Sequence, residues 1–327
     1  MMVTCSAPGM RVLVTGAGGF VGSWLLRALR SKLSSVDQVY ALGHTNAVAI
    51  ASTNESSVLC DLIDAEAISA LIASIQPTCV VHLAGVTAVQ DARRSPRRAW
   101  EVNLSGTMNV AEAVLRFAPR AKVIFAGTSE VYGGTFGWWD GPVDESAPLD
   151  PTNAYAASKA AADLMIGQMV REGLNAVRFR PFNHTGPGQS DTFVVPAFAS
   201  QIARIEKGVQ KPVIEVGNLD AERDFLDVRD VVAAYILALF QEVPNLYGKV
   251  FNLASGSPRR VGDILEELVS QATVPIQIRQ DPARLRPSDT PVTTGDASAA
   301  RGLLGWQPTI PWEVTVRDVM SYWRTSL

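Results

Sequence analysis

The sequence has few of the side chains that build metal sites and disulfide frameworks. Among its 327 residues it contains three cysteines, Cys5, Cys60 and Cys79, and three histidines. Neither set has the close spacing of zinc ligands, so no metal site is expected. So few cysteines favour a reducing compartment, and the cytoplasm is the predicted location.

The sequence also lacks a strong net charge and long apolar runs. A net charge of -3 gives no electrostatic reason to expect nucleic acid or an anionic membrane as a partner. No apolar run approaches the roughly 20 residues needed to span a bilayer. The segment 1–9 has neither a basic flank nor a long apolar core, so it is predicted to be a loose leader rather than a signal peptide.

A glycine-rich turn lies between a predicted strand and a predicted helix near the N-terminus. The run Arg11–Thr15 is followed by Gly16, Gly19 and Gly22 and then by an amphipathic stretch up to Leu29. Gly16 permits a tight turn, Gly19 lets the backbone approach a pyrophosphate, and Gly22 lets the helix pack closely on the strand. The spacing is G-x-x-G-x-x-G rather than G-x-G-x-x-G, but its place before a helix N-terminus predicts dinucleotide binding.

Strand and helix patterns alternate through the first half of the chain. Further strands are predicted at 38–42, 57–60, 79–83, 122–126 and 176–180, and helices at 66–75 and 100–117. This alternation predicts an α/β fold of the Rossmann type, a doubly wound parallel sheet with ligands at the carboxyl ends of its strands. The candidate residues follow those strands: Gly16, Asp61, Ala84, Gly85, Thr128, Pro181 and Asn183.

The second half predicts a smaller α/β substrate-binding domain. Its elements are expected at 196–208, 213–216 and 261–271, and the tail 311–323 closes the fold. The segments 225–228, 229–240 and 250–253 are predicted to rejoin the nucleotide-binding domain. The NAD(P)-binding Rossmann domain is predicted at 10–181 plus 225–256. The substrate-binding domain is predicted at 182–224 plus 257–327, and ligands are expected in the cleft between the two.

Tyr155 and Lys159 lie four residues apart in a predicted helix, so their side chains leave the same face one turn apart. A free tyrosine hydroxyl, with a pKa of about 10, exchanges protons poorly at neutral pH. A nearby ammonium favours the phenolate and lowers that pKa, as general acid–base chemistry requires. An ordinary surface helix can carry the same two residues, so the catalytic interpretation depends on whether the chain also binds a cofactor.

The end of the second predicted strand lacks the usual cofactor-selecting side chain. Leu42–Asn46 offers neither a carboxylate for the ribose of NAD nor an arginine for the 2′-phosphate of NADP. Gly43 leaves room, and His44 or Thr45 could bond a phosphate. These residues favour NADP over NAD.

Several motifs in the right order resemble the extended short-chain dehydrogenase/reductase family of NAD(P)-dependent sugar-nucleotide epimerases, dehydratases and reductases. They are the glycine turn 16–22, Asp61-Leu62, His82–Gly85, Asn103, Thr128 with Val131–Gly133, and the Tyr155/Lys159 pair. The resemblance covers nearly the whole chain. It implies that the cofactor is bound by Gly16, Gly19, Phe20, Val21, Gly22, His44, Asp61, Leu62, Leu83, Ala84, Gly85, Asn103, Tyr155, Lys159 and Pro181.

The same resemblance assigns catalytic roles. It implies that Tyr155 exchanges a proton with the substrate oxygen and that Lys159 lowers the pKa of Tyr155 and holds the nicotinamide ribose. Thr128 takes the family's Ser/Thr place, where it hydrogen-bonds the same oxygen.

Within the family, the second half resembles the GDP-4-keto-6-deoxy-D-mannose reductases, which form GDP-D-rhamnose. The matching segments are 180–189, 193–198, 222–230 and 286–289. Arginines suit a nucleoside diphosphate because they bind phosphate oxygens in pairs. The resemblance implies that the substrate, a GDP-sugar, is bound by Asn183, Val194, Arg223 and Arg286.

Three functions remain open from the sequence. The preferred one is a reductase in which NAD(P)H delivers hydride to C4 of a GDP-linked 4-keto-6-deoxyhexose while Tyr155 donates a proton. The second is a 4,6-dehydratase or 4-epimerase with tightly bound NAD(P)+, because Thr128-Ser-Glu130 resembles the dehydratase triplet and Glu130 could be catalytic. The third is an inactive NAD(P)-binding regulator, against which the intact Thr128, Tyr155 and Lys159 argue.

A homodimer is predicted from two helices beside the expected active site, Asn103–Phe117 and Ala154–Val170. Their apolar residues cover more than one face, as Leu164, Met165 and Met169 illustrate. In the family, such helices pair across a two-fold axis.

Overall fold

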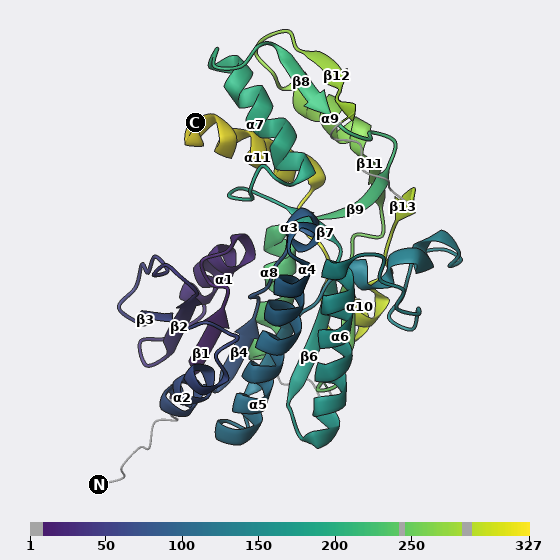
Figure 1. Cartoon of the computed structure of the whole chain (residues 1–327). Coiled ribbons are helices and arrows are strands. Elements are labelled where there is room, and N and C mark those ends of the chain that lie inside the picture. The colour runs from purple at the N-terminus through teal and green to yellow at the C-terminus, as the bar shows by residue number, and fades with distance from the viewer. Residues whose placement is uncertain (1–8, 242–245, 283–289) are drawn as a thin grey trace. The chain divides into compact units, whose positions relative to one another are not determined.

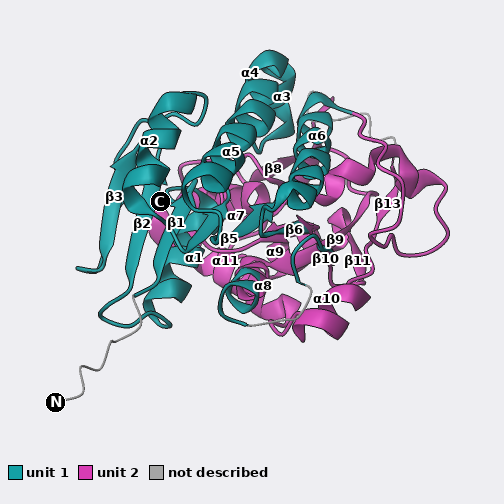
Figure 2. Cartoon of the chain, turned by 90° about the horizontal axis from the view of Figure 1, so that it is seen from below, with its two compact units in different colours: residues 1–127, 153–179, 235–250 teal, residues 128–152, 180–234, 251–327 magenta. Residues whose placement is uncertain are grey.

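The structure is a computed structural model that describes residues 9–241, 246–282 and 290–327 (Figure 1). Arg286 and nearly all of the predicted leader lie outside these residues. The chain forms two compact units (Figure 2): unit 1 contains 1–127, 153–179 and 235–250, and unit 2 contains 128–152, 180–234 and 251–327. The predicted domain boundaries stay a prediction.

A seven-stranded sheet organises the first half of the chain. Its order is β10-β6-β5-β4-β1-β2-β3, and the ladders from β3 through to β6 are parallel. This confirms the Rossmann-type α/β fold. The strands are β1 (Arg11–Thr15), β2 (Gln38–Gly43), β3 (Glu55–Leu59), β4 (Cys79–His82), β5 (Lys122–Ala126), β6 (Ala176–Pro181) and β10 (Val250–Leu253).

Helices of unit 1 cover this sheet with apolar side chains. Ile72 of α2, Val114 of α5 and Ile166 of α6 are buried in one core with Val80 and Val123 of the strands. Helix α5 packs against both α2 and α6 (Figure 1). The helical segments are α1 (Phe20–Arg30), α2 (Ala65–Ile75), α3 (Val89–Arg94), α4 (Pro96–Trp100), η1 (Glu101–Gly106), α5 (Thr107–Phe117), α6 (Ala154–Met169) and η3 (Val170–Glu172).

The predicted single helix over 100–117 is wrong in one respect. A π-helical segment, η1, occupies Glu101–Gly106 between α4 and α5. A π-turn holds one more residue than an α-turn, and apolar periodicity over a few residues does not distinguish the two.

Unit 2 has its own core and two small sheets. One sheet has the order β11-β9-β13 with β7 also paired to β9, and the other joins β12 to β8. Phe198, Phe225, Leu265, Trp312 and Val316 are buried together in this unit. The elements are η2 (Ser129–Gly137), β7 (Asn183–Thr185), α7 (Val194–Glu206), β8 (Val213–Val216), β9 (Glu222–Asp227), β11 (Pro258–Arg260), α9 (Val261–Ser270), β12 (Gln277–Gln280), β13 (Val292–Thr293), α10 (Ser298–Leu304) and α11 (Trp312–Ser326); α8 (Val228–Phe240) runs from unit 2 into unit 1.

The segment 225–228, predicted to rejoin the nucleotide-binding domain, is not part of the large sheet. Strand β9, which contains most of this segment, pairs with β11, β13 and β7 instead. A short apolar strand looks alike in either sheet, because its partner is chosen by tertiary packing rather than by local pattern. Strand β10, which covers the predicted strand 250–253, is an edge strand of the large sheet.

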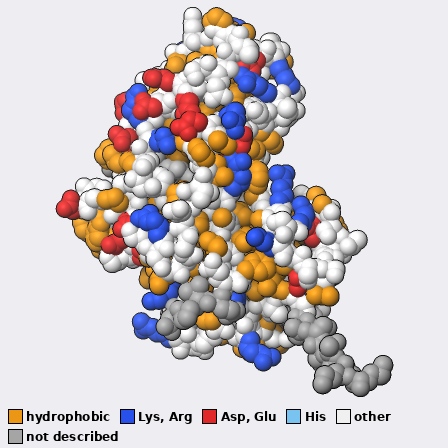
Figure 3. Space-filling view, turned by 180° about the vertical axis from the view of Figure 1, so that it is seen from behind, with side chains coloured by type: hydrophobic (Ala, Val, Ile, Leu, Met, Phe, Trp, Pro, Cys, Tyr) orange, Lys and Arg blue, Asp and Glu red, His pale blue; other side chains and the backbone are white. Residues whose placement is uncertain are grey.

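Acidic and basic side chains are interspersed with apolar ones on the face shown in Figure 3. No helix among the described residues is both long and apolar enough to cross a membrane. The described ranges also contain no group of three or more His, Cys, Asp or Glu side chains that could hold a metal ion.

Candidate active site

The glycine turn after β1 leaves no room for side chains. Gly16 has φ +68, and a Cβ there would lie 2.7 Å from the amide nitrogen of Ala84 at the end of β4. A Cβ on Gly22 would lie 2.4 Å from the carbonyl oxygen of Gly16. Gly19 is the N-cap of α1 and makes no side-chain cap, and a helix N-terminus is a favourable place for an anion. These features fit the pyrophosphate of a dinucleotide.

A buried histidine connects the ends of β1 and β4. The Thr15 hydroxyl lies 2.8 Å from Nδ1 of His82, and Nε2 of His82 lies 2.9 Å from the Thr107 hydroxyl. Thr107 donates onward to the Asn103 carbonyl at 2.6 Å, and the Ala84 N–H donates to Thr15 at 3.2 Å. His82 therefore donates through Nε2 and accepts through Nδ1, as a neutral ring.

Burial, together with the charge of Lys159, lowers the pKa of His82 to about 3. His82 thus stays neutral and fixes the backbone from Ala84 onward. His82 lies in one of the family motifs, but no role was predicted for it. One sequence signal could have pointed to this role. His82 ends an otherwise apolar strand, and Thr15 ends the neighbouring strand at the same level.

Asn103 joins the segment after β4 to helix α6. Its Oδ1 accepts from the Val86 N–H at 2.8 Å, while its Nδ2 donates to the Val86 carbonyl at 3.2 Å and to Ser158 Oγ at 3.0 Å. Ser158 in turn donates to the Tyr155 carbonyl at 2.8 Å. A Cβ on Gly85 would lie 2.8 Å from Asn103 Oδ1. The π-helical segment therefore presents Asn103 at the centre of a fully bonded network.

Tyr155 and Lys159 occupy the first turns of α6, whose N-cap is Asn153. The Asn153 side chain accepts from the Ala156 N–H at 2.9 Å. Both candidate residues are buried, with 9% of Tyr155 and 5% of Lys159 exposed. Lys159 Nζ donates to the Ala126 carbonyl at 2.5 Å.

Burial lowers the pKa of Lys159 from its ordinary value of 10.5 to about 8, although Asp163 opposes the shift. The ammonium also lies 4.7 Å from the centre of the Phe125 ring. Lys159 is therefore a cation at neutral pH that loses its proton in mildly alkaline solution.

Two basic side chains approach Asp61, which follows β3. His44 Nε2 lies 3.1 Å from Asp61 Oδ2, and Arg98 Nη2 lies 3.9 Å from the same oxygen. Burial raises the pKa of Asp61, but the Ile63 N–H and the charges of His44 and Arg98 lower it below its usual value. The structure thus brings together two predicted residues, and it adds Arg98 of α4, which was missed because it is far from both in the sequence.

Unit 2 contains Glu130, predicted as a possible catalytic residue, and Arg223, predicted to bind the substrate. Thr128 caps η2, accepting from the Glu130 N–H at 3.2 Å. Burial raises the pKa of Glu130, and the charge of Arg223 opposes the shift. Arg223 Nη1 donates to the carbonyls of Glu222 at 2.8 Å and Pro291 at 3.3 Å. Glu130 and Arg223 are therefore electrostatic neighbours.

The other predicted residues are placed by their elements. Asn183 lies on β7 in register with Phe225 of β9. Val194 begins α7 and Pro181 ends β6. Leu62 is buried, and its carbonyl accepts from Asn109 at 2.8 Å. Phe20 and Val21 open α1, and Leu83 follows β4. The binding and catalytic roles of all these residues stay predictions.

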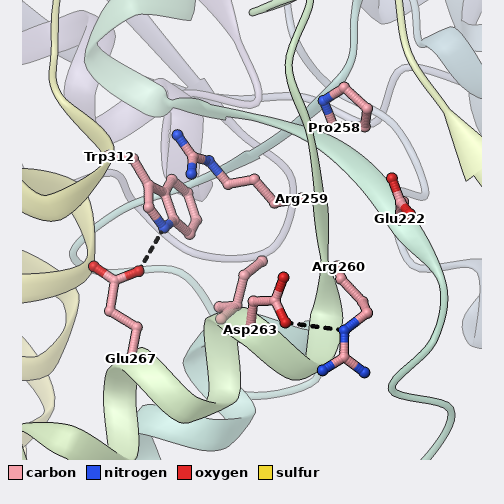
Figure 4. Close-up of a pocket in the computed structure, with 8 residues that line it drawn as sticks. Glu222, Pro258, Arg259, Arg260, Asp263, Glu267 and Trp312 are labelled. Atoms are coloured by element: carbon pink, nitrogen blue, oxygen red, sulfur yellow. Dashed lines mark hydrogen bonds and ion pairs between the residues drawn. The ribbon is translucent and has the colours of Figure 1, made fainter.

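A cavity of about 290 Å³ in unit 2 contains none of the predicted site residues (Figure 4). The Arg259 guanidinium lies 5.0 Å from the centre of the Trp312 ring, and Trp312 Nε1 donates to Glu267 at 2.9 Å. Glu222 and Asp263 also line it. Three carboxylates and two arginines give this cavity no preference for an anion such as a diphosphate.

Known proteins resemble this chain over nearly its full length. The family described as GDP-mannose 4,6 dehydratase matches residues 13–319. GDP-6-deoxy-D-mannose reductase of Pseudomonas aeruginosa is 34% identical over 316 residues, which cover 96% of this chain and 97% of the reductase. GDP-mannose 4,6 dehydratase 2 of Arabidopsis thaliana is 29% identical over 334 residues, 96% of this chain and 87% of that protein.

Solved structures agree with these relatives. RMD from Pseudomonas aeruginosa complexed with NADPH superimposes with a TM-score of 0.84 at 32% identity, covering 97% of this chain and 100% of that one. UDP-glucose 4-epimerase of Thermus thermophilus, in complex with NAD, has a TM-score of 0.82 at 26% identity with the same coverage. The chain therefore belongs to the extended short-chain dehydrogenase/reductase family of NAD(P)-dependent sugar-nucleotide enzymes, in its GDP-mannose 4,6-dehydratase branch.

Proposed function

We propose that the protein is an NADPH-dependent reductase that converts a GDP-linked 4-keto-6-deoxyhexose to GDP-6-deoxy-D-mannose, also called GDP-D-rhamnose. The observation that carries the proposal is the end-to-end similarity to a GDP-6-deoxy-D-mannose reductase at 34% identity. The buried Tyr155 and Lys159 in the first turns of α6 supply the proton chemistry such a reduction needs.

When bound, the dinucleotide supplies the hydride for C4 of the sugar. Tyr155 donates a proton to the carbonyl oxygen as that oxygen becomes a hydroxyl. Lys159, charged below a pH of about 8, stabilises the phenolate that Tyr155 becomes. Thr128 donates a hydrogen bond to the same oxygen, and the Asn103 network keeps the start of α6 in place.

The preference for NADPH is supported by the two basic groups beside Asp61. His44 and Arg98 both approach this carboxylate, so a 2′-phosphate bound there would meet two basic side chains beside the one acid. We expect kcat/KM to be higher with NADPH than with NADH. His44→Ala should reduce kcat/KM with NADPH by about three- to tenfold and leave kcat/KM with NADH unchanged.

The experiment that tests the function supplies the enzyme with the 4-keto product of a GDP-mannose dehydratase and NADPH. We expect one NADPH to be consumed for each GDP-D-rhamnose formed, as measured by absorbance and chromatography. Consumption with a UDP- or dTDP-linked 4-keto sugar but not with the GDP-linked one would contradict the proposal.

A 4,6-dehydratase or 4-epimerase is the second candidate, favoured by buried Glu130, whose pKa is raised. In a dehydratase a carboxylate at this position removes the C5 proton. GDP-mannose given alone decides the matter, because a dehydratase with retained NAD(P)+ forms a 4-keto product without added NADPH. Binding of NADPH with no turnover of any 4-keto sugar nucleotide would instead favour a regulator.

We also propose a homodimer formed through α5 and α6. A hollow of about 520 Å³ on these helices is lined by Met108, Leu115, Met165 and Met169, with Glu112, Arg116, Gln168 and Glu172 also lining it. Leu164 on the same helix pair is 60% exposed. Sedimentation at micromolar concentration should give a dimer, and Leu164→Glu should shift it toward monomer.

A further inference from the structure

Several polar side-chain atoms of unit 2 are buried without a hydrogen-bond partner. Among the described residues this group consists of Arg178 Nε in unit 1 and, in unit 2, Thr185 Oγ1, Gln189 Oε1, Thr293 Oγ1 and Thr294 Oγ1. A buried polar atom without a partner destabilises the free protein. Such atoms therefore identify places where a bound molecule can complete the hydrogen bonding.

Thr293 shares a sheet face with Arg223. The two residues are in register in the parallel ladder between β13 and β9, so their side chains leave the same face. Arg223 Nη1 donates to the carbonyl of Pro291, two residues before Thr293. The guanidinium of Arg223 therefore lies along β13, the strand that also carries the Thr293 hydroxyl.

A second polar group interacts with Arg223. Glu130 affects Arg223 electrostatically, and the segment η2 that carries Glu130 packs against β13. The unpartnered hydroxyl of Thr293 is thus part of a polar region of unit 2 built from β9, β13 and η2.

The residues next to Thr293 and Arg223 make contacts elsewhere. Arg259 is in register with Arg223 on the opposite side, through β11, but its guanidinium covers the Trp312 ring (Figure 4). Thr294 directly follows the last residue of β13 and has no register partner on β9. Its carbonyl accepts from the Val143 N–H at 3.0 Å.

We propose that the Thr293 hydroxyl is a ligand of the sugar-nucleotide diphosphate, donating a hydrogen bond to a phosphoryl oxygen that Arg223 also holds. The proposal rests on the proposed function for the identity of the nucleotide and for the role of Arg223. A phosphoryl oxygen accepts several hydrogen bonds, and an arginine binds it with directed N–H groups. The Thr293 hydroxyl has no competing partner and rotates freely to donate.

The test compares Thr293→Val with Thr294→Val, since each removes one unpartnered hydroxyl and only Thr293 is in register with Arg223. Dissociation constants for GDP and for GDP-mannose are measured by calorimetry on the full-length protein. We expect Thr293→Val to weaken both ligands by about five- to thirtyfold and Thr294→Val to change neither by more than about twofold. Thr293→Ser, which keeps the hydroxyl, should retain the affinity of the original protein.

A purely structural role predicts different results. If Thr293 only supported the fold, Thr293→Val would lower the melting temperature without ligand, whereas a ligand role leaves it unchanged or raised. The proposal is overturned if Thr293→Val binds GDP as tightly as the original protein, or if the original protein binds no GDP. Failure of the reductase assay with GDP binding and the Thr293 effect intact would refute the proposed reaction and leave this inference standing.

Discussion

Polar side chains in the two units differ in whether they have hydrogen-bond partners. In unit 1 the side chains that follow β4 are bonded to one another, from Thr15 through His82 and Thr107 to Asn103 and Ser158. In unit 2 the groups on β7 and β13 include hydroxyls with no partner. The first region is complete before any ligand arrives, and the second is not.

The difference separates two ways of serving a reaction. A network that is already bonded holds Tyr155 and Lys159 in place without reorganisation at the moment of proton transfer. Groups that lack partners are satisfied by the ligand, so they contribute to its affinity and to ligand-dependent stability. We therefore expect substitutions in the bonded network of unit 1 to affect the rate or the fold, and substitutions of the unpartnered groups on β7 and β13 to affect substrate binding.

Tyr155→Phe should give the largest effect. Loss of the proton donor should lower kcat by about 10²- to 10⁴-fold in the reductase assay, with little change in NADPH affinity. Tyr322→Phe on α11 is the matched control and should keep full activity. A Tyr155→Phe enzyme with more than about a tenth of the original rate would show that another group protonates the sugar.

Asn103→Ala should break the completed network itself. It removes hydrogen bonds to Val86 and Ser158 and leaves partly buried backbone groups of Val86 without these partners. The free energy of unfolding should fall by about 2–4 kcal/mol in denaturant titration. Asn109→Ala, which removes a single bond to Leu62, should lower it by only about 1 kcal/mol. Equal losses would mean that the network is no more important than one isolated bond.

Lys159 should give unit 1 a pH dependence in both activity and stability. Turnover should fall as pH rises through about 8, where the ammonium loses its proton. Between about 8 and the ordinary value of 10.5 the unfolded chain binds more protons than the folded one, so the free energy of unfolding should rise with pH there. Lys159→Met should flatten this rise of the free energy of unfolding with pH. Because its side chain carries no buried charge, this variant should also have a higher melting temperature than the original protein at pH 7. A lower melting temperature would refute the cost assigned to the buried ammonium.

Glu130→Gln should give the smallest effect if the enzyme is a reductase. Burial raises the pKa of Glu130, and the charge of Arg223 opposes the shift; glutamine keeps the size and shape of this side chain but cannot exchange a proton. We expect kcat to change by less than about threefold, with a modest rise in KM for the sugar nucleotide. A loss of about a hundredfold or more would instead assign a proton-transfer role to Glu130 and favour the dehydratase.

Local patterns predicted the strands of the large sheet because alternation of strands with helices restricts topology strongly. The glycine turn was equally accessible, since Gly16 and Gly22 are required by close backbone approach. The partners of β9 were not, because pairing between segments far apart in sequence depends on packing that no local pattern records. For the same reason Arg98 was missed and His82 was named without its bonds to Thr15 and Thr107.

The π-helical segment Glu101–Gly106 makes this part of the chain sensitive to its length. An α-helix turns by about 100° per residue. Deleting one residue from the segment would restore ordinary helical winding, and Pro96–Trp100 and Glu101–Gly106 would then turn by that angle relative to Thr107–Phe117. Single substitutions on the exposed side can accumulate there, but a one-residue insertion or deletion would carry Asn103 away from Val86 and Ser158 together.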